Sequence, residues 1–107
     1  MADENDDAIT AEKLFWFLTT AYILRAVGLL RPDKEEKIDL LTASSGTDWR
    51  EEVRSHLDIN DTYIRSLYAV GTEFKTKMQS VRFILRGLGC PSTEERLSEF
   101  HELRDLE

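Results

Sequence analysis

The stretch that decides the fold is LFWFLTTAYILRAVGLL, residues 14–30, in which Arg25 is the only charged side chain. At 100° per residue its apolar side chains reach nearly all the way round a helix, and such a helix is either buried on most sides or placed in a membrane. Seventeen residues is the lower edge of a membrane-spanning length, and a charge near the bilayer centre costs about 2.5–3.5 kcal/mol. We therefore predict a buried central helix over about residues 11–29, and no membrane contact.

The sequence on either side of this helix predicts where it ends. Residues 1–8 hold four acidic side chains and no basic one, which predicts a disordered acidic tail ahead of a single helical domain over 9–107. Thr10 is predicted to be the N-cap, because its hydroxyl accepts from an unpaired backbone N–H of the first turn. Pro32 is predicted to end the helix, because proline lacks a backbone N–H and restricts the residue before it.

Shorter amphipathic patterns follow, each introduced by a capping residue. The predicted helices span about residues 34–43, 49–57, 61–88 and 92–106. Asp33, Asp48, Asn60 and Ser92 are the predicted caps. No alternating pattern typical of β-strands is present. The predicted fold is a small all-α bundle of about five helices, with the first helix central and apolar and the 61–88 helix long and amphipathic.

The predicted long helix carries a heptad seam, which is a stripe of residues spaced alternately three and four apart. Its members are Ile64, Leu67, Gly71, Phe74, Met78, Val81, Leu85 and Leu88. Such a seam requires an apolar partner helix. The partner is the first helix of the same chain, the same long helix of a second copy, or both, and the spacing alone does not choose between them.

A homodimer interface is predicted from the apolar residues that short neighbouring helices would leave uncovered. One side of the first helix carries Leu14, Leu18, Tyr22 and Leu29. Four short helices are not expected to cover both this side and the opposite one. An uncovered apolar patch of that size marks an interaction surface. The predicted interface residues are Trp16, Ile23, Val27 and Leu30 on the first helix, with Phe74 and Met78 on the long one.

Charge is unevenly distributed along the chain. Fourteen basic and 21 acidic residues give a net charge of 14 − 21 = −7, yet residues 62–91 carry five basic side chains against one acidic, which is +4. The remainder is therefore −11. The basic segment suggests an alternative function, contact with phosphate in a nucleic-acid-bound assembly. The predicted contact residues are Lys75, Lys77, Arg82 and Arg86. Acidic neighbouring helices that neutralise the segment are the simpler explanation, and a net charge of −7 weakens non-specific attraction to phosphate.

Catalytic motifs are scarce. Asp48, Glu52 and His56 share one helix face, but neither His56 nor His101 has the glutamate three residues earlier that di-iron bundles use. One cysteine, Cys90, forms no disulfide within the chain. The sequence contains no phosphate-binding loop, dinucleotide fingerprint or nucleophile elbow. We predict a protein that is not an enzyme and that uses no cofactor or metal.

These observations together predict a non-catalytic interaction module located in the cytoplasm. It would bind another protein as an adaptor, an assembly factor or an acidic inhibitor, and would itself be a homodimer. The alternative is a small helical subunit of a nucleic-acid-bound assembly that contacts phosphate through the basic segment.

Overall fold

The computed structural model describes residues 3–70 and 77–90, with side chains described for residues 11–70 and 79–90. Five α-helices and one short 3-10 helix lie within these ranges: α1 (Asp3–Ala26), α2 (Pro32–Thr42), η1 (Ala43–Ser45), α3 (Trp49–Leu57), α4 (Asp61–Val70) and α5 (Lys77–Gly87). The described part of the chain contains no β-strand. The prediction of a small all-α bundle is confirmed.

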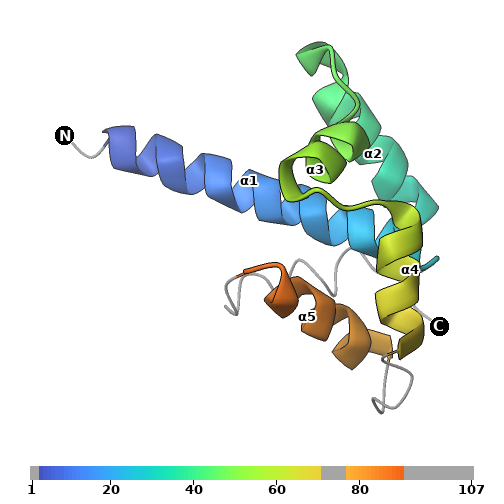
Figure 1. The fold of residues 1–107 in the computed structure, drawn as a ribbon. Coiled ribbons are helices and arrows are strands. Elements are labelled where there is room, and N and C mark those ends of the chain that lie inside the picture. The colour runs from blue at the N-terminus through green and yellow to red at the C-terminus, as the bar shows by residue number, and fades with distance from the viewer. Residues whose placement is uncertain (1–2, 71–76, 91–107) are drawn as a thin grey trace.

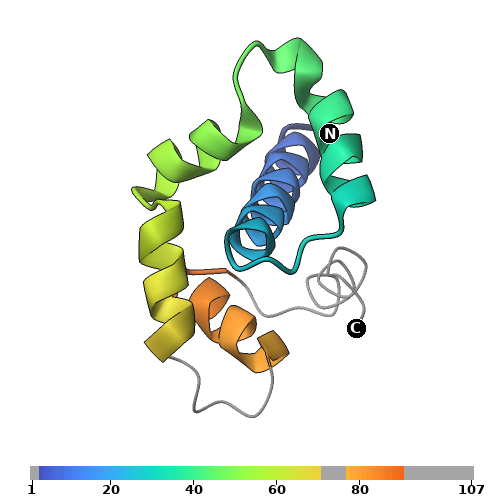
Figure 2. The same ribbon diagram turned by 90° about the vertical axis from the view of Figure 1, so that its right-hand side faces the viewer.

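Helix α1 lies at the centre of the bundle, as predicted. Helices α3, α4 and α5 all pack against it, and its N-terminal turns extend beyond them (Figures 1 and 2). The hydrophobic core is built largely from the C-terminal half of α1, and Tyr22, Ile23 and Leu24 are fully buried. Residues of the other helices complete the core, among them Ile38, Trp49, Ile64 and Val81. The C-terminal part of the apolar stretch is therefore covered by the protein's own helices, while Leu14 at its start is 53% exposed.

The ends of α1 differ from the predicted ones. The helix begins at Asp3, within the stretch predicted to be a tail and before the predicted Thr10 cap. Acidic residues are favourable near the N-terminus of a helix, because the helix dipole is positive at that end. The helix ends at Ala26 and not at Pro32: the Leu29 N–H donates to the Leu24 carbonyl at 2.7 Å, and Gly28, two residues after the end, is left-handed with φ +80°. That pattern is a Schellman motif. Pro32 instead opens α2, at a position where its missing N–H removes no hydrogen bond.

Replacing Gly28 by alanine is expected to lower the free energy of unfolding by about 1 kcal/mol. Its Cβ would meet no atom within 4 Å, so the cost comes from the left-handed backbone, which disfavours L-residues by about 1–2 kcal/mol. Gly87→Ala is the matched control, because Gly87 lies in α5 outside the left-handed region and also has an open Cβ position. Urea denaturation of both variants would measure the difference. Equal stability of the two variants would contradict the assignment of Gly28 as the left-handed residue of the motif that ends α1.

The stretch predicted as one long helix forms two separate helices, α4 and α5, that both pack against α1 (Figure 2). Residues 71–76, which separate them and include Gly71 and Phe74, lie outside the described part. The heptad members Ile64, Val81 and Leu85 are buried, as the seam predicts. A single 28-residue helix would be about 42 Å long and could not keep its whole stripe against the buried half of α1. Two shorter helices can each place their apolar stripe against α1.

The predicted caps have mixed outcomes. The Asp48 carboxylate accepts from the Arg50 backbone N–H and caps α3, and Asn60 Oδ1 accepts from the Tyr63 N–H at 2.8 Å at the start of α4. The predicted Asp33 cap is wrong, because α2 begins with Pro32 and the Asp33 carboxylate is paired with the Arg31 guanidinium. The predicted helix over 92–106 and its Ser92 cap lie outside the described residues.

Candidate interaction surface

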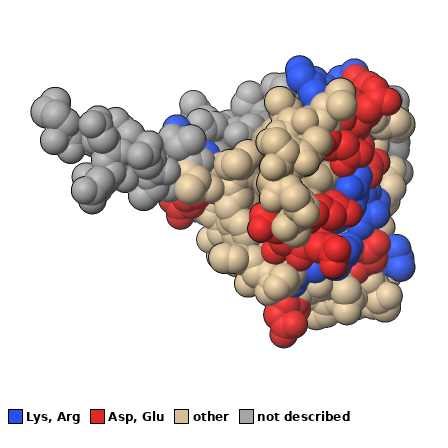
Figure 3. Space-filling view, turned by 90° about the horizontal axis from the view of Figure 1, so that it is seen from above, with Lys and Arg blue, Asp and Glu red and all other residues tan. Residues whose placement is uncertain are grey.

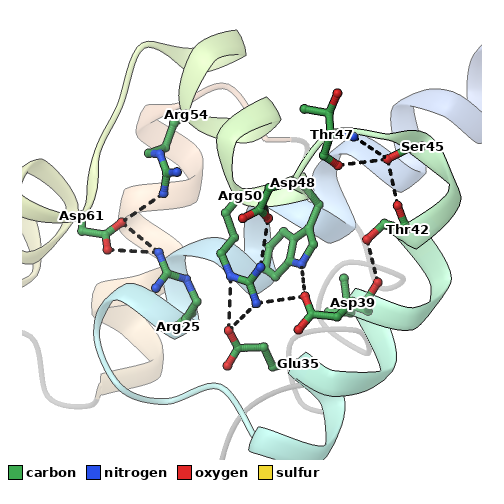
Figure 4. Close-up of polar contacts among 12 residues, drawn as sticks. Arg25, Glu35, Asp39, Thr42, Ser45, Thr47, Asp48, Arg50, Arg54 and Asp61 are labelled. Carbon is green, nitrogen blue, oxygen red and sulfur yellow. Dashed lines mark hydrogen bonds and ion pairs between the residues drawn. The ribbon is translucent and has the colours of Figure 1, made fainter.

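Arg50 at the start of α3 forms hydrogen bonds and ion pairs with two carboxylates of α2 (Figure 4). The Arg50 guanidinium donates to Glu35 Oε2 at 2.7 Å and to Asp39 Oδ1 at 2.9 Å, both on α2, and to Asp48 Oδ1 at 2.9 Å. The guanidinium carbon also lies 4.7 Å from the centre of the Trp49 ring. Trp49 Nε1 donates to the same Asp39 oxygen at 2.9 Å. We call Arg50, Trp49 and these three carboxylates the α2–α3 clamp.

The clamp shifts the pKa values of two of its members, Asp48 and Arg50. Burial acts to raise the pKa of Asp48, but hydrogen bonds from the Arg50 backbone and guanidinium outweigh it and hold that pKa below its ordinary value. Burial acts to lower the pKa of Arg50, and the hydrogen bonds to Glu35 and Asp48 reverse this and raise it. Both shifts favour the charged forms of Asp48 and Arg50, and the charge-assisted hydrogen bonds of Arg50 fix the orientation of α2 on α3.

A second ionic cluster joins α1, α3 and α4 around Asp61. The Asp61 carboxylate accepts from the Arg25 guanidinium at 2.9 and 3.0 Å and from the Tyr22 hydroxyl, and it lies 3.9 Å from the Arg54 guanidinium. Burial acts to raise the pKa of Asp61, but the hydrogen bonds from Tyr22 and Arg25 hold it below its ordinary value. Burial and the hydrogen bond to Asp61 raise the pKa of Tyr22.

Because the α2–α3 clamp fixes the orientation of α2, it also determines which side of α2 faces solvent. Ile38 is the only fully buried side chain of α2, and Leu40 and Leu41 are 72% and 69% exposed. The exposed side chains recur at spacings of three and four, so they lie on one side of the helix. We call this set the α2 outer face; it consists of Asp33, Glu36, Lys37, Leu40 and Leu41.

The space-filling view from above the α2–α3 side shows how charge is arranged there (Figure 3). Acidic and basic side chains are interleaved in one area, and beside it lies a broad area of neutral side chains. Since the clamp already pairs Arg50 with three carboxylates, much of that charge is satisfied within the chain. Leu40 and Leu41, by contrast, are large apolar side chains of α2 that stay exposed.

The predicted interface residues of α1 are placed inside the molecule. Trp16, Ile23 and Leu30 are buried within a single chain, and Val27 is partly buried against the core. The expectation that one side of α1 is left for a second copy is therefore wrong for these residues, because α3, α4 and α5 together surround α1. Of the other two predicted residues, Phe74 lies outside the described part, and Met78 belongs to α5 with its side chain outside the description.

Two of the four residues predicted to contact phosphate have described side chains. Arg82 and Arg86 are exposed one turn apart on α5, and Phe83 beside them is 61% exposed. Lys77 is the first residue of α5, with its side chain outside the description, and Lys75 lies outside the described residues. The structure therefore presents a short basic and apolar strip on α5.

The remaining candidate sites are reported for the described residues only. No group of three or more His, Cys, Asp or Glu side chains there could hold a metal ion. The ring of His56 lies against Phe15, with 4.8 Å between ring centres. Among the described residues, no helix is both long enough and apolar enough to cross a membrane.

Sequence reasoning missed the α2 outer face, although the sequence carries the signal. Ile38, Leu40 and Leu41 are the apolar residues of α2. On a helical wheel Leu40 lies about 200° from Ile38, so the two cannot share a buried side. The spacing therefore already requires that at least one leucine points away from the core.

Comparisons with known proteins identify no relative. No protein-family model matches this chain, and neither the curated proteins nor the solved structures include a match to it.

Proposed function

We propose that this chain is a non-catalytic protein-interaction module that works in the cytoplasm as a homodimer and presents the α2 outer face to a protein partner. The observation that supports the proposal is the exposure of Leu40 and Leu41, side by side on a helix whose orientation is fixed by the α2–α3 clamp. Single exposed leucines are ordinary on a protein surface. Two adjacent leucines on a rigid helix form an apolar patch, and covering that patch with a partner would lower the free energy.

The α2 outer face has the composition of a protein contact. Its apolar pair is bordered by Asp33, Glu36 and Lys37, which supply a polar rim. Protein interfaces commonly place a small apolar centre inside such a rim. A helix that is already oriented also costs little conformational entropy on binding, which favours affinity.

Affinity capture from the native host tests the proposal. Tagged wild-type protein is expected to retain one or more partners at stoichiometric levels, and Leu40→Asp/Leu41→Asp is expected to lose them, because two carboxylates would have to be desolvated in the contact. Val70→Asp is the matched control, since Val70 is an equally exposed apolar residue on α4. Circular dichroism should show that all three proteins are equally helical.

The proposal is contradicted if the leucine variant retains the same partners as wild type. It is also contradicted if the control variant loses them to the same extent, because binding would then not depend on α2.

A second candidate function rests on Arg82 and Arg86, which are exposed on one side of α5. If they contact phosphate, binding of a labelled single-stranded oligonucleotide should weaken by about 0.7 decades per decade of salt for each contact. Arg82→Glu/Arg86→Glu should abolish it. Binding that survives this double reversal would eliminate the nucleic-acid candidate.

A further inference from the structure

Helix α2 lies in a stretch of chain that places one side chain in the core. Leu29 and Leu30 just before this stretch are buried, and so is Trp49 just after it. Between residues 31 and 48, however, Ile38 is the only buried side chain. The chain therefore leaves the core at residue 31 and returns to it at residue 49, and both of these points are well anchored.

The α2–α3 clamp supplies the other described contacts that attach α2. Glu35 and Asp39 accept from the Arg50 guanidinium, and Asp39 also accepts from the Trp49 indole. The Glu35 and Asp39 side chains are 31% and 47% exposed. Water can therefore solvate both carboxylates when they separate from Arg50, and breaking the clamp costs less than breaking a fully buried ion pair.

The backbone at the two ends of the stretch can change direction. Arg31, directly before α2, is extended with φ −67° and ψ 130°, and Gly46 after η1 is left-handed with φ +81°. No neighbouring group lies within 4 Å of the position that a Cβ would take at Gly46. Hinges are commonly loop positions of this kind, and glycine adopts many backbone conformations. Both connections run outside the helices that they join (Figure 2).

We propose that residues 31–48 open as one unit, in which α2 leaves the bundle while α1, α3 and α4 stay folded. Segments that bury little apolar surface open at a lower free energy than the whole chain unfolds, and they do so as cooperative units. The opening breaks the hydrogen bonds of Arg50 with α2. It also exposes Ile38 and the indole N–H of Trp49.

The opening would control the α2 outer face. In the attached form the clamp holds Leu40 and Leu41 in one orientation, and in the open form it does not. A ligand shifts a two-state equilibrium toward the form that it binds better, so a partner on the α2 outer face would favour the attached form. That consequence rests on the proposed function, whereas the opening itself is a property of the free chain.

Amide hydrogen exchange of the free wild-type protein, followed residue by residue by NMR at low urea concentrations, tests the opening. We expect the amides of residues 36–41 to exchange faster than those of Tyr22–Leu24, which lie in the fully buried part of α1. The reason is that the amides of α2 become accessible in the open form, whereas those of α1 require unfolding of the whole bundle.

Ile64→Val distinguishes local opening from global unfolding. Ile64 is fully buried on α4 and stays packed in the open form, so the variant destabilises the unfolding of the bundle and the opening of α2 to different extents. Exchange at Tyr22–Leu24 should become about 2- to 12-fold faster, as expected for loss of one buried methylene. Exchange at residues 36–41 should not change.

Arg50→Gln tests the clamp. It removes the guanidinium and should make exchange at residues 36–41 about tenfold faster, because the attached form loses its hydrogen bonds to Glu35 and Asp39. Arg65→Gln is the matched control, since Arg65 is exposed on α4 outside the clamp. It makes the same chemical change and should leave the exchange of α2 unaltered.

Three results would overturn the proposal. The first is exchange of residues 36–41 that is as slow as that of Tyr22–Leu24. The second is equal acceleration of both sets by Ile64→Val, because α2 would then open only when the whole chain unfolds. The third is wild-type exchange of α2 in Arg50→Gln. None of these measurements involves a partner, so the capture experiment on the α2 outer face succeeds or fails independently of them.

Discussion

Replacing Trp49 by alanine is expected to lower the free energy of unfolding by about 3–5 kcal/mol, the cost of removing a large aromatic side chain from a core. Trp49 is 2% exposed, and its indole also donates to Asp39 in the α2–α3 clamp. Its loss would leave a cavity and would also weaken the attachment of α2. Since small domains are stable by about 5–15 kcal/mol, much of the total would be lost.

Trp49→Phe separates the two contributions and keeps the prediction testable if the alanine variant does not fold. Phenylalanine retains an aromatic ring in the core but cannot donate to Asp39, so we expect a loss of about 1–2 kcal/mol. Val70→Ala is the control, because Val70 is 76% exposed and should change stability little. Urea denaturation followed by far-ultraviolet circular dichroism measures all three. A loss below 1 kcal/mol for Trp49→Ala would show that α3 does not pack as described.

Replacing Asp61 by asparagine is expected to lower the free energy of unfolding by about 2 kcal/mol at pH 7. Asp61 accepts charge-assisted hydrogen bonds from Arg25 and faces Arg54, and all three side chains are only partly exposed. The asparagine variant keeps the shape but leaves both guanidinium groups without a carboxylate. Hydrogen bonds to charged groups are worth about 1.5–3 kcal/mol.

The effect of Asp61 is expected to depend on pH in one direction. Its pKa is lower in the folded chain than its ordinary value, so the unfolded chain takes up the proton first as pH falls. The stabilisation by Asp61 is therefore complete above about pH 5 and is lost as pH falls through about 4, the ordinary aspartate pKa, toward the lower native one. The stability difference between wild type and Asp61→Asn should shrink over that interval.

Asp58→Asn is the matched control for this series. Asp58 is an exposed residue at the end of α3 with φ 55°, a conformation that asparagine adopts readily. The Asp58→Asn variant makes the same chemical change three residues from Asp61. It should alter the free energy of unfolding by less than about 0.5 kcal/mol. A difference between wild type and Asp61→Asn that stays constant from pH 7 to pH 3 would contradict the role given to the carboxylate.

Local rules of sequence were sufficient for much of the fold. The caps at Asp48 and Asn60 were predictable, because Asp and Asn directly before an apolar stripe are typical helix N-caps whose side chains accept from the first free backbone N–H groups. The burial of α1 was predictable from residues 14–30, since an apolar helix must be covered by something. In each case the signal lies within one or two helical turns.

What could not be predicted depends on contacts between distant residues. The continuous three-four spacing from Ile64 to Leu88 is identical for one long helix and for two helices that both face α1. The covering of Trp16 and Ile23 likewise depends on how many helices surround α1, which the composition of α1 does not specify. The outward side of α2 is set by the contacts of Arg50 with Glu35 and Asp39, 15 and 11 residues earlier in the chain.

The central claim is that the α2 outer face is a contact surface for a protein partner. Affinity capture from the native host with wild type, Leu40→Asp/Leu41→Asp and Val70→Asp as baits at the same level tests it most directly. We predict the same stoichiometric partner for wild type and for the Val70 variant, and loss of that partner for a fully helical leucine variant. One and the same set of partners for all three proteins would contradict the claim.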